Sequence, residues 1–418
     1  MTLVEFYDKS PMDSIISSLT MQPDKIILLG EKYGLQEQGE RIVSLLRDRG
    51  REPELECRVV PRGNVAAMES ALLEIVESEP ALTIDLTGGE DLALFAAGQL
   101  CERFRGRGIQ FHWFNLLSGW VQDCDLDGVK IPESQPSLTV EALIRLQGGK
   151  VAFDTEKPDG SHLWPTDEEF GRDIEAMWAI CARDSARWNR QLQTLNNLDA
   201  HREPGEDPLL TVADAPEVRR ILDNPRDREE LDEVLTALRQ AGLLTEYALG
   251  RDTVRFRYKS AAVRQALDKA GTALELMTWH LCREAEFRDQ AVYTDAQTGV
   301  YIDWDGIVHE GNTPETDNEI DVLLMRGMIP YFISCKNGTI DTEELYKVQT
   351  VAERFGGPYA RKVLICTTWG SMNEHKQATL RDRAREMGIY ILEGVHRMSR
   401  EEFSEALRKL PDRTIHVG

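Results

Sequence analysis

The alternation of short apolar runs with amphipathic segments over residues 1–125 constrains the fold more than any other feature of this sequence. The apolar runs have the length of strands, and the segments between them carry apolar residues at helical spacing. We expect strands at Leu3–Tyr7, Lys25–Gly30, Glu56–Val60, Leu82–Leu86 and Ile109–Leu116, and helices around Ile42–Leu46, at Val65–Val76 and at Leu92–Phe104. Strands that alternate with helices pair in parallel, which predicts an α/β fold with a doubly wound, Rossmann-like sheet. Ligands of such sheets bind at the carboxyl ends of the strands.

The middle of the chain is predicted to be a helical spacer with a winged-helix-like element. Helices are expected over residues 165–200 and 227–241, followed by two β-like runs at Thr245–Leu249 and Thr253–Tyr258. Pro132–Ser137 and His201–Pro208 have the polar, proline-containing composition of breaks. A winged helix binds DNA in some proteins and spaces domains in others. Because no basic recognition helix is evident, the structural role is favoured.

Length and composition limit the class of protein. The 418 residues suffice for two or three domains, which we place at 1–135, 136–268 and 269–418. No apolar run approaches the ~20 residues of a membrane span, and the N-terminus lacks a signal-peptide pattern, so we expect a cytoplasmic protein without a membrane partner. Seven scattered cysteines argue against a zinc cluster or a disulfide framework. A net charge of −23 excludes non-specific wrapping of nucleic acid.

Residues with the chemistry of phosphodiester cleavage gather in one expected hairpin of the C-terminal unit. Asp321 lies inside an apolar strand, and Lys336 ends the next apolar strand after Ser334 and Cys335. A hairpin of this length places Asp321 and Lys336 side by side. Carboxylates hold a hard cation such as Mg²⁺, which polarises the phosphate, and a lysine orients water or stabilises the developing charge.

Two glutamates add to this group. Glu319 precedes Asp321 in the same strand, and Glu275 lies in an otherwise apolar helix expected from Gly271 to Ala285. A carboxylate on a buried helix face is unfavourable unless it is paired or bound to a metal. The structural alternative for Glu275 is a position facing solvent or a salt bridge.

The C-terminal motifs resemble the PD-(D/E)xK restriction-endonuclease-like domain of CRISPR ancillary nucleases that cyclic oligoadenylate activates. The resemblance rests on Gly271–Glu275, Asn318–Val322, Phe332–Asn337 and Leu345–Lys347 leading to Phe355–Gly357, in this order. It implies a nuclease core that binds Mn²⁺ or Mg²⁺, with Asp321 as the central ligand, the backbone carbonyl of Cys335 as a second ligand, and Lys336 as the catalytic lysine.

One position departs from this pattern. The family has Asp or Glu two residues before the lysine, and this chain has Ser334. Serine is a poor Mg²⁺ ligand. Three alternatives remain open: Glu319 or Glu275 completes the site, the metal is held more loosely, or the domain is inactive.

The strongest N-terminal motif is Asp85-Leu-Thr87-Gly88-Gly89-Glu90, between the fourth strand and its helix. Glycines let backbone N–H groups approach a phosphate, and the helix N-terminus adds a positive field. The motif and the element order resemble CARF domains, which sense cyclic oligoadenylates. Ligand contacts are therefore expected from Thr87, Gly88 and Gly89, and from the loop after the first strand through Lys9 and Ser10. The departure is Glu90-Asp91, where the family often has Thr-Lys.

Sensor, spacer and nuclease together resemble the whole architecture of these CRISPR nucleases. The resemblance implies a metal-dependent nuclease of type III CRISPR antiviral defence that acts on DNA, RNA or both as a homodimer. Its expected allosteric activator is cyclic tetra-adenylate, whose two-fold symmetry matches that of the dimer. The alternative is a non-catalytic regulator that binds DNA in response to cyclic oligoadenylate. A sensor that cleaves its own activator ranks lower, because residues 1–125 show no dedicated catalytic pair.

Overall fold

The computed structural model describes residues 1–104, 108–117, 119–123, 128–130, 135–152, 164–199, 207–213, 215–306, 317–369 and 372–414. The sequence predicts breaks at Pro132–Ser137 and His201–Pro208, and residues 132–134 and 201–206 of these breaks lie outside the described residues. Within the described part of the chain, no helix has the length and apolar character needed to cross a membrane.

The N-terminal unit is the expected doubly wound α/β sheet. Its seven strands lie in the order β3-β2-β1-β4-β5-β6-β7, with parallel pairing from β3 to β5 and an antiparallel hairpin after β5. The strands are β1 Thr2–Phe6, β2 Lys25–Gly30, β3 Glu54–Val59, β4 Leu82–Asp85, β5 Ile109–Asn115, β6 Trp120–Asp123 and β7 Gly128–Lys130, and the helices are α1 Met12–Met21, α2 Leu35–Arg47, α3 Val65–Ser78 and α4 Asp91–Arg103. The chain reverses its winding direction at β1 and β4, so the loops after these two strands form the switch point where such sheets bind ligands.

The sequence did not predict α1. Its run Met-Asp-Ser-Ile-Ile-Ser-Ser-Leu-Thr-Met contains three serines, which have low intrinsic helix propensity. Ser14, Ser17 and Ser18 are nevertheless buried, and Ser18 Oγ donates to Glu5 Oε1 at 2.8 Å. Tertiary packing and buried hydrogen bonds therefore stabilise this helix where local propensity does not.

A lobe of helices and a small sheet occupies residues 164–267. Its three-stranded antiparallel sheet has the order β10-β11-β9, and two consecutive helices connect β9 to β10, as in a winged helix. The elements are α6 Glu168–Arg183, α7 Ser185–Asp199, β9 Leu210–Ala213, α8 Ala215–Ile221, α9 Pro225–Gln240, β10 Leu244–Leu249, β11 Val254–Tyr258 and α10 Ala261–Ala266. The helical region expected over 165–200 consists of two helices, separated at Asp184, whose carboxylate accepts a hydrogen bond from the N–H of Arg187.

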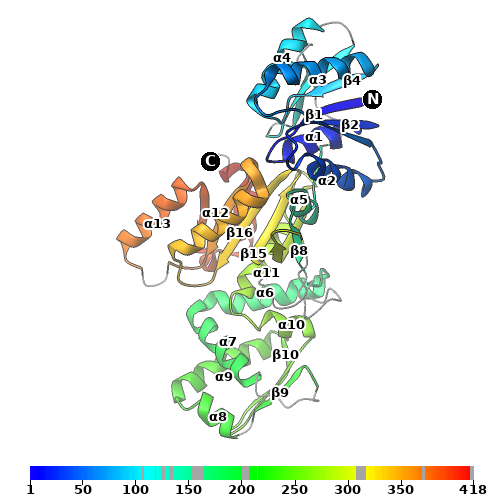
Figure 1. Ribbon diagram of the computed structural model, residues 1–418. Helices are drawn as coiled ribbons and strands as arrows, with labels where there is room; N and C mark the ends of the chain where they lie inside the picture. Colours follow the sequence, from blue (N-terminus) through cyan, green and yellow to red (C-terminus); the bar gives the residue numbers. More distant parts are fainter. Residues whose placement is uncertain are drawn as a thin grey trace.

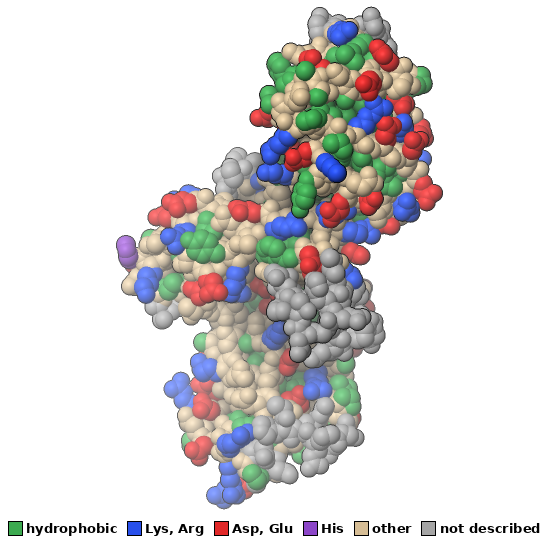
Figure 2. All heavy atoms as spheres, viewed as in Figure 1, with side chains coloured by type: hydrophobic (Ala, Val, Ile, Leu, Met, Phe, Trp, Pro, Cys, Tyr) green, Lys and Arg blue, Asp and Glu red, His purple; other side chains and the backbone are tan. Residues whose placement is uncertain are grey.

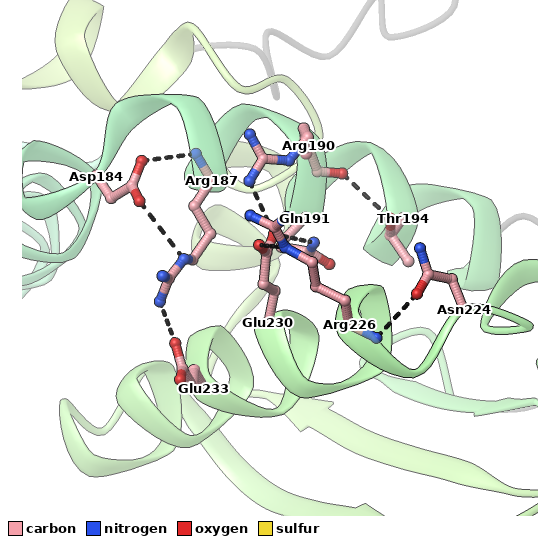
Figure 3. A network of polar contacts seen from close by, with 9 residues as sticks. All are labelled: Asp184, Arg187, Arg190, Gln191, Thr194, Asn224, Arg226, Glu230 and Glu233. Carbon is pink, nitrogen blue, oxygen red and sulfur yellow. Dashed lines mark hydrogen bonds and ion pairs between the residues drawn. The ribbon is translucent and has the colours of Figure 1, made fainter.

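Ion pairs fix α9 against α7 in this lobe (Figure 3). The side chain of Glu230 is 9% exposed and accepts hydrogen bonds from Arg190, Gln191 and Arg226 at 2.8, 3.2 and 3.1 Å. α9 itself contains three arginines and five carboxylates. α9 has more carboxylates than arginines, and some of these carboxylates pair with arginines of α7. Both observations favour a structural role of the winged-helix-like element over DNA binding.

The C-terminal unit is built on a six-stranded mixed sheet of order β18-β17-β16-β15-β14-β8. Pairing is antiparallel from β8 to β16 and parallel from β16 to β18. The elements are α11 Thr272–Arg283, β12 Glu286–Phe287, β13 Gln290–Ala291, β14 Asp295–Asp303, β15 Asp317–Arg326, β16 Ile329–Lys336, α12 Thr342–Gly356, η1 Gly357–Tyr359, β17 Arg361–Cys366, α13 Glu374–Glu386, β18 Ile389–Glu393, η2 Val395–Arg397, α14 Arg400–Arg408 and α15 Leu410–Thr414. The expected hairpin and the helices on either side of it are all present.

The segment between the two sheets contributes to the second one. After α5 (Val140–Leu146), the short strand β8 (Lys150–Ala152) pairs with β14 and becomes the edge of the C-terminal sheet. The range predicted as a spacer, 136–268, therefore includes a strand of the predicted nuclease domain. Its helical lobe lies at the opposite end of the C-terminal sheet from the N-terminal unit (Figure 1).

The two sheets share an apolar core. α1 and α2 pack together with α5, α12 and one face of the C-terminal sheet, in a cluster that includes Met12, Ile15, Leu45, Leu143, Leu323, Val351 and Phe355. The other face of that sheet packs against α11, α14 and the helical lobe, through residues such as Val322, Leu324 and Ile333. Consecutive residues of β15 thus point to opposite buried faces, as the two-residue repeat of a strand requires. The predicted sensor contacts the predicted nuclease sheet directly.

Candidate metal and phosphodiesterase site

The β15–β16 hairpin brings Asp321 opposite Ser334, because Val322 pairs with Ile333. The Asp321 Oδ2 atom accepts the backbone N–H of Cys335 at 2.6 Å and the hydroxyl of Ser334 at 3.2 Å. Burial raises the pKa of Asp321, while Lys336 and these two hydrogen bonds act in the opposite direction. The backbone thus fixes this carboxylate at the end of an otherwise apolar strand.

Lys336 lies on the same sheet face as Asp321 and Ser334. Its Nζ atom is 3.8 Å from Asp321 Oδ2 and 3.0 Å from Oε2 of Glu344 on α12. Burial lowers the pKa of the ammonium, but the two carboxylates outweigh burial and the net pKa is raised. The structure therefore brings the predicted aspartate and lysine together, in the arrangement that the hairpin length indicated.

Glu275 projects from the first turn of α11 towards these residues. Burial raises its pKa to about 8, with further contributions from the charges of Asp321 and Glu319. Burial is the main cause of both raised pKa values, and repulsion from neighbouring carboxylates adds to it. A divalent cation between them would remove this repulsion. Oxygen ligands of this kind suit Mn²⁺ or Mg²⁺, so the donor set fits the predicted metal.

Glu319 lies on the solvent side of this group. Its Oε2 atom is 3.8 Å from Nζ of Lys269, and its carboxylate accepts a hydrogen bond from Tyr301. Glu275, Glu319, Lys269 and Tyr301 all line an open cleft of about 840 Å³ that also contains Trp164. Of the predicted carboxylates, Glu275 and Glu319 therefore line a solvent-open cleft that also holds the Lys269 ammonium and two aromatic rings.

Cys335 contributes its backbone to the site. Its N–H donates to Asp321, and its thiol is buried and 3.7 Å from the Thr278 hydroxyl of α11. The predicted role of its carbonyl as a metal ligand stays a prediction.

Glu344, Lys269 and Tyr301 were not predicted from the sequence as site residues. Glu344 follows Asp341 by three residues, a spacing typical of a helix capping box, so its pattern indicated a structural residue. Lys269 and Tyr301 lie in separate segments, and neither segment contains a motif. Only the pairing of β14 with β15, which sets Tyr301 opposite Glu319, brings them to the site.

A second cluster of potential metal ligands is better explained as an ion-pair network. Glu175, His280 and Glu284 lie close enough to share an ion. Arg400, however, already pairs with both carboxylates at 2.6 Å. The guanidinium supplies the positive charge that a metal would bring.

At the switch point of the N-terminal sheet, internal hydrogen bonds hold the Thr87–Gly89 loop. The Thr87 hydroxyl donates to Asp85 Oδ1 at 2.5 Å and accepts the N–H of Phe114 at 2.9 Å. The N–H of Gly89 donates to Asp8 Oδ2 at 3.1 Å, which joins this loop to the loop after β1. At Gly88, an added Cβ would lie 2.9 Å from that of Asp13, so the loop packs closely on α1.

Lys9 and Ser10, also predicted to contact a ligand, have different surroundings. Lys9 is exposed at the switch point. The Ser10 hydroxyl oxygen is buried, and a Cβ added at Gly357 of η1 would lie 2.8 Å from it. Ser10 therefore faces the C-terminal unit, and Lys9 is the better placed of the two for a ligand.

Glu90 is already paired with a cationic side chain of the protein. Its carboxylate pairs with Arg62 at 2.9 Å, and both line a cleft of about 440 Å³ at the ends of β1, β2 and β3. Thr87 and Gly88 lie beside this cleft and do not line it. Arg62 was not predicted from the sequence as a site residue, although its loop, Pro61-Arg-Gly-Asn64, follows the carboxyl end of a strand.

Comparisons with known proteins agree on the fold. The chain is similar over 100% of its length to the crystal structure of protein VC1899 from Vibrio cholerae, with a TM-score of 0.70, 17% identity and 98% of that chain covered. It is similar over 99% of its length to Can2 from Sulfobacillus thermosulfidooxidans in complex with cyclic tetra-adenylate, with a TM-score of 0.63, 17% identity and 97% coverage. No family model and no curated protein sequence matches. At these identities the comparisons show that the whole chain shares this two-sheet architecture.

Proposed function

We propose that this chain is a metal-dependent nuclease of type III CRISPR defence that a cyclic oligoadenylate activates. The observation that carries the proposal is the group formed by Glu275, Asp321 and Lys336 at the end of the β15–β16 hairpin. The fold shared with a protein that binds cyclic tetra-adenylate supports the activator.

The chemistry follows from the donor set. A Mn²⁺ or Mg²⁺ ion held by Asp321 and Glu275, with the Cys335 carbonyl as a further ligand, would polarise a phosphate and lower the pKa of a bound water. Lys336 carries the positive charge that stabilises the developing negative charge on the phosphate. Glu319 keeps Lys269 at the entrance of the cleft.

The substrate is a nucleic acid that is held locally. Lysine and arginine side chains are interspersed with carboxylates over the face shown in Figure 2 and do not form a broad basic surface there. With a net charge of −23, the chain cannot rely on extended phosphate neutralisation. Contact through the metal, Lys269 and the aromatic rings of the cleft explains how an acidic protein holds DNA or RNA.

The activator lies at the switch point of the N-terminal sheet, between two copies of the chain. Leu92 and Phe95 of α4 are exposed beside the Thr87–Gly89 loop, and an apolar helix face in this position suits a symmetric contact. We expect the 47.4 kDa chain to sediment as a dimer, with twice this mass.

The second candidate, a DNA-binding regulator without catalytic activity, depends on the winged-helix-like lobe. The carboxylates of α9 and their pairing with α7 disfavour it (Figure 3). One assay separates the two functions. Single- and double-stranded DNA and RNA are incubated with the chain, with and without cyclic tetra- or hexa-adenylate, in Mn²⁺, Mg²⁺ or EDTA. Cleavage that requires a metal and increases with activator is expected. Activator-dependent DNA binding without cleavage under any condition would support the regulator.

Ser334 gives a prediction that does not depend on cleavage. Its hydroxyl donates to Asp321, so Ser334→Glu places a third carboxylate beside Asp321 and Glu275. We expect this variant to unfold at a lower temperature in EDTA, because an unpaired buried charge costs several kcal/mol. Mn²⁺ should raise its midpoint more than that of the wild type.

Ser334→Ala is the matched control, since it removes the hydrogen bond and adds no charge. Equal unfolding midpoints for Ser334→Glu and Ser334→Ala in EDTA would show that position 334 does not face the carboxylates.

A further inference from the structure

Glu344 is the residue on α12 that contacts Lys336. Its Oε2 atom is 3.0 Å from Lys336 Nζ, and its Oε1 atom is 3.5 Å from Nζ of Lys347. The neighbouring Glu343 pairs with the same Lys347 at 3.2 Å, but its side chain is 72% exposed against 19% for Glu344. Of these two carboxylates in the first turn of α12, the inner one is thus directed at the site.

Local helix geometry does not explain this direction. Asp341 is the N-cap of α12 and accepts the N–H of Glu344 at 3.2 Å, which is half of a capping box. In a complete capping box, the Glu344 side chain would return to the backbone N–H of Asp341. Its two oxygens pair instead with Lys336 and Lys347. Glu344 therefore gives up a local stabilising contact and holds the ammonium of the strand residue.

The other end of α12 contacts the N-terminal unit. The helix has 15 residues and so spans about 22 Å. It runs into η1, where the Tyr359 side chain hydrogen-bonds to Asp13 of α1 and Gly357 packs against Ser10. Asp13 in turn packs against Gly88 of the switch-point loop. A continuous set of contacts thus joins this loop to Lys336, with α12 as the rigid element between them (Figure 1).

We propose that Glu344 is the positioning residue of Lys336, and that α12 transmits the state of the switch-point loop to it. Glu344 supplies, from the helix, a carboxylate beside Lys336. It acts on the lysine and does not reach the substrate. This inference rests on the proposed nuclease function.

The test compares Glu344→Ala and Glu344→Gln with the matched variant Glu343→Ala, which also removes a carboxylate from the first turn of α12. Full-length protein is assayed with saturating activator and Mn²⁺. Glu344→Ala should lower kcat on the order of 10²-fold, because a displaced catalytic group loses this much rate. Glu344→Gln, which keeps an oxygen acceptor, should lose less. In both Glu344 variants, KM and the Mn²⁺ concentration for half-maximal rate should stay at wild-type values. The cleavage rate of Glu343→Ala should equal that of the wild type.

The transmission step is tested with Tyr359→Phe, which removes the hydroxyl that bonds Asp13. The rate without activator should not change, and the increase caused by activator should fall several-fold. Tyr346→Phe removes a hydroxyl from the exposed side of the same helix and should behave as wild type.

Each other outcome overturns a defined part of the proposal. A higher Mn²⁺ requirement in Glu344→Ala would make Glu344 a metal ligand, and a higher rate without activator would make it an inhibitory contact. Equal kcat for Glu344→Ala and Glu343→Ala would remove its role while leaving the nuclease function intact. If the wild type does not cleave nucleic acid, the proposed nuclease function is wrong. The catalytic role of the lysine that Glu344 is proposed to position would then be wrong as well. Unchanged activation of Tyr359→Phe would exclude transmission through α12.

Discussion

Asp321→Asn is expected to reduce metal-dependent cleavage on the order of 10³-fold without unfolding the protein. The loss of a charged ligand removes several kcal/mol of transition-state stabilisation, and each 1.4 kcal/mol is a tenfold change in rate. Asparagine retains an oxygen that can accept the N–H of Cys335, now bonded to Asp321 at 2.6 Å, so the hairpin keeps its geometry. Alanine would leave this buried N–H without an acceptor and would therefore destabilise the protein. A loss of activity in the alanine variant could then come from unfolding as well as from the lost metal ligand.

The measurements are the cleavage rate in Mn²⁺ and the shift of the unfolding midpoint on adding Mn²⁺. Both should be lost in Asp321→Asn. Asp303→Asn is the matched control, because Asp303 is a buried carboxylate on the adjacent strand β14, outside the group around Lys336. If Asp321→Asn cleaves at the wild-type rate, the metal site lies elsewhere. If both variants lose activity equally, the effect comes from the sheet and not from the carboxylate.

The sequence predicted this hairpin because its signals are local. The continuous apolar runs Val322–Met325 and Tyr331–Ile333, each with a polar residue at one end, Asp321 and Ser334, predict two strands buried on both faces. The turn between Arg326 and Ile329 fixes the register, and the register sets Asp321 opposite Ser334. The doubly wound, parallel character of the N-terminal sheet was equally accessible, because strands that alternate with helices pair in parallel.

The contacts that join the two sheets were not accessible in this way. Ser10 was predicted to contact a ligand from its position after β1, and only the packing of η1 on this loop shows that its hydroxyl is buried there. β8 has three residues, and its pairing with β14, more than 140 positions away, makes it a strand. The serine-rich α1 is likewise stabilised by a core formed with α12 and the second sheet. Such contacts depend on tertiary packing, which local propensity does not report.

The switch point of the N-terminal sheet, where we propose that the activator binds, gives the second prediction. Lys9→Ala is expected to weaken binding of cyclic tetra-adenylate by about 10- to 100-fold, the value of one hydrogen bond to a charged group. Several carboxylates lie around the switch point, and each is already in contact with protein. Asp8 accepts the N–H groups of Ser10 and Gly89, and Glu90 pairs with Arg62. An anionic ligand therefore needs a cation here, and Lys9 is exposed in the loop after β1.

Titration calorimetry at two salt concentrations measures the affinity of the wild type and of Lys9→Ala for cyclic tetra-adenylate. Removing one phosphate contact should reduce the salt dependence of binding as well as the affinity. The activator concentration for half-maximal cleavage should rise by the same factor, while the rate without activator stays constant. Lys32→Ala is the matched control, since Lys32 is also exposed but follows β2, one strand from the switch point. Normal binding by Lys9→Ala together with weak binding by Lys32→Ala would place the activator in the cleft at the ends of β2 and β3, where Arg62 and Glu90 lie. The path to Lys336 would then start from that cleft, and the contact between Gly88 and Asp13 would no longer be its first step.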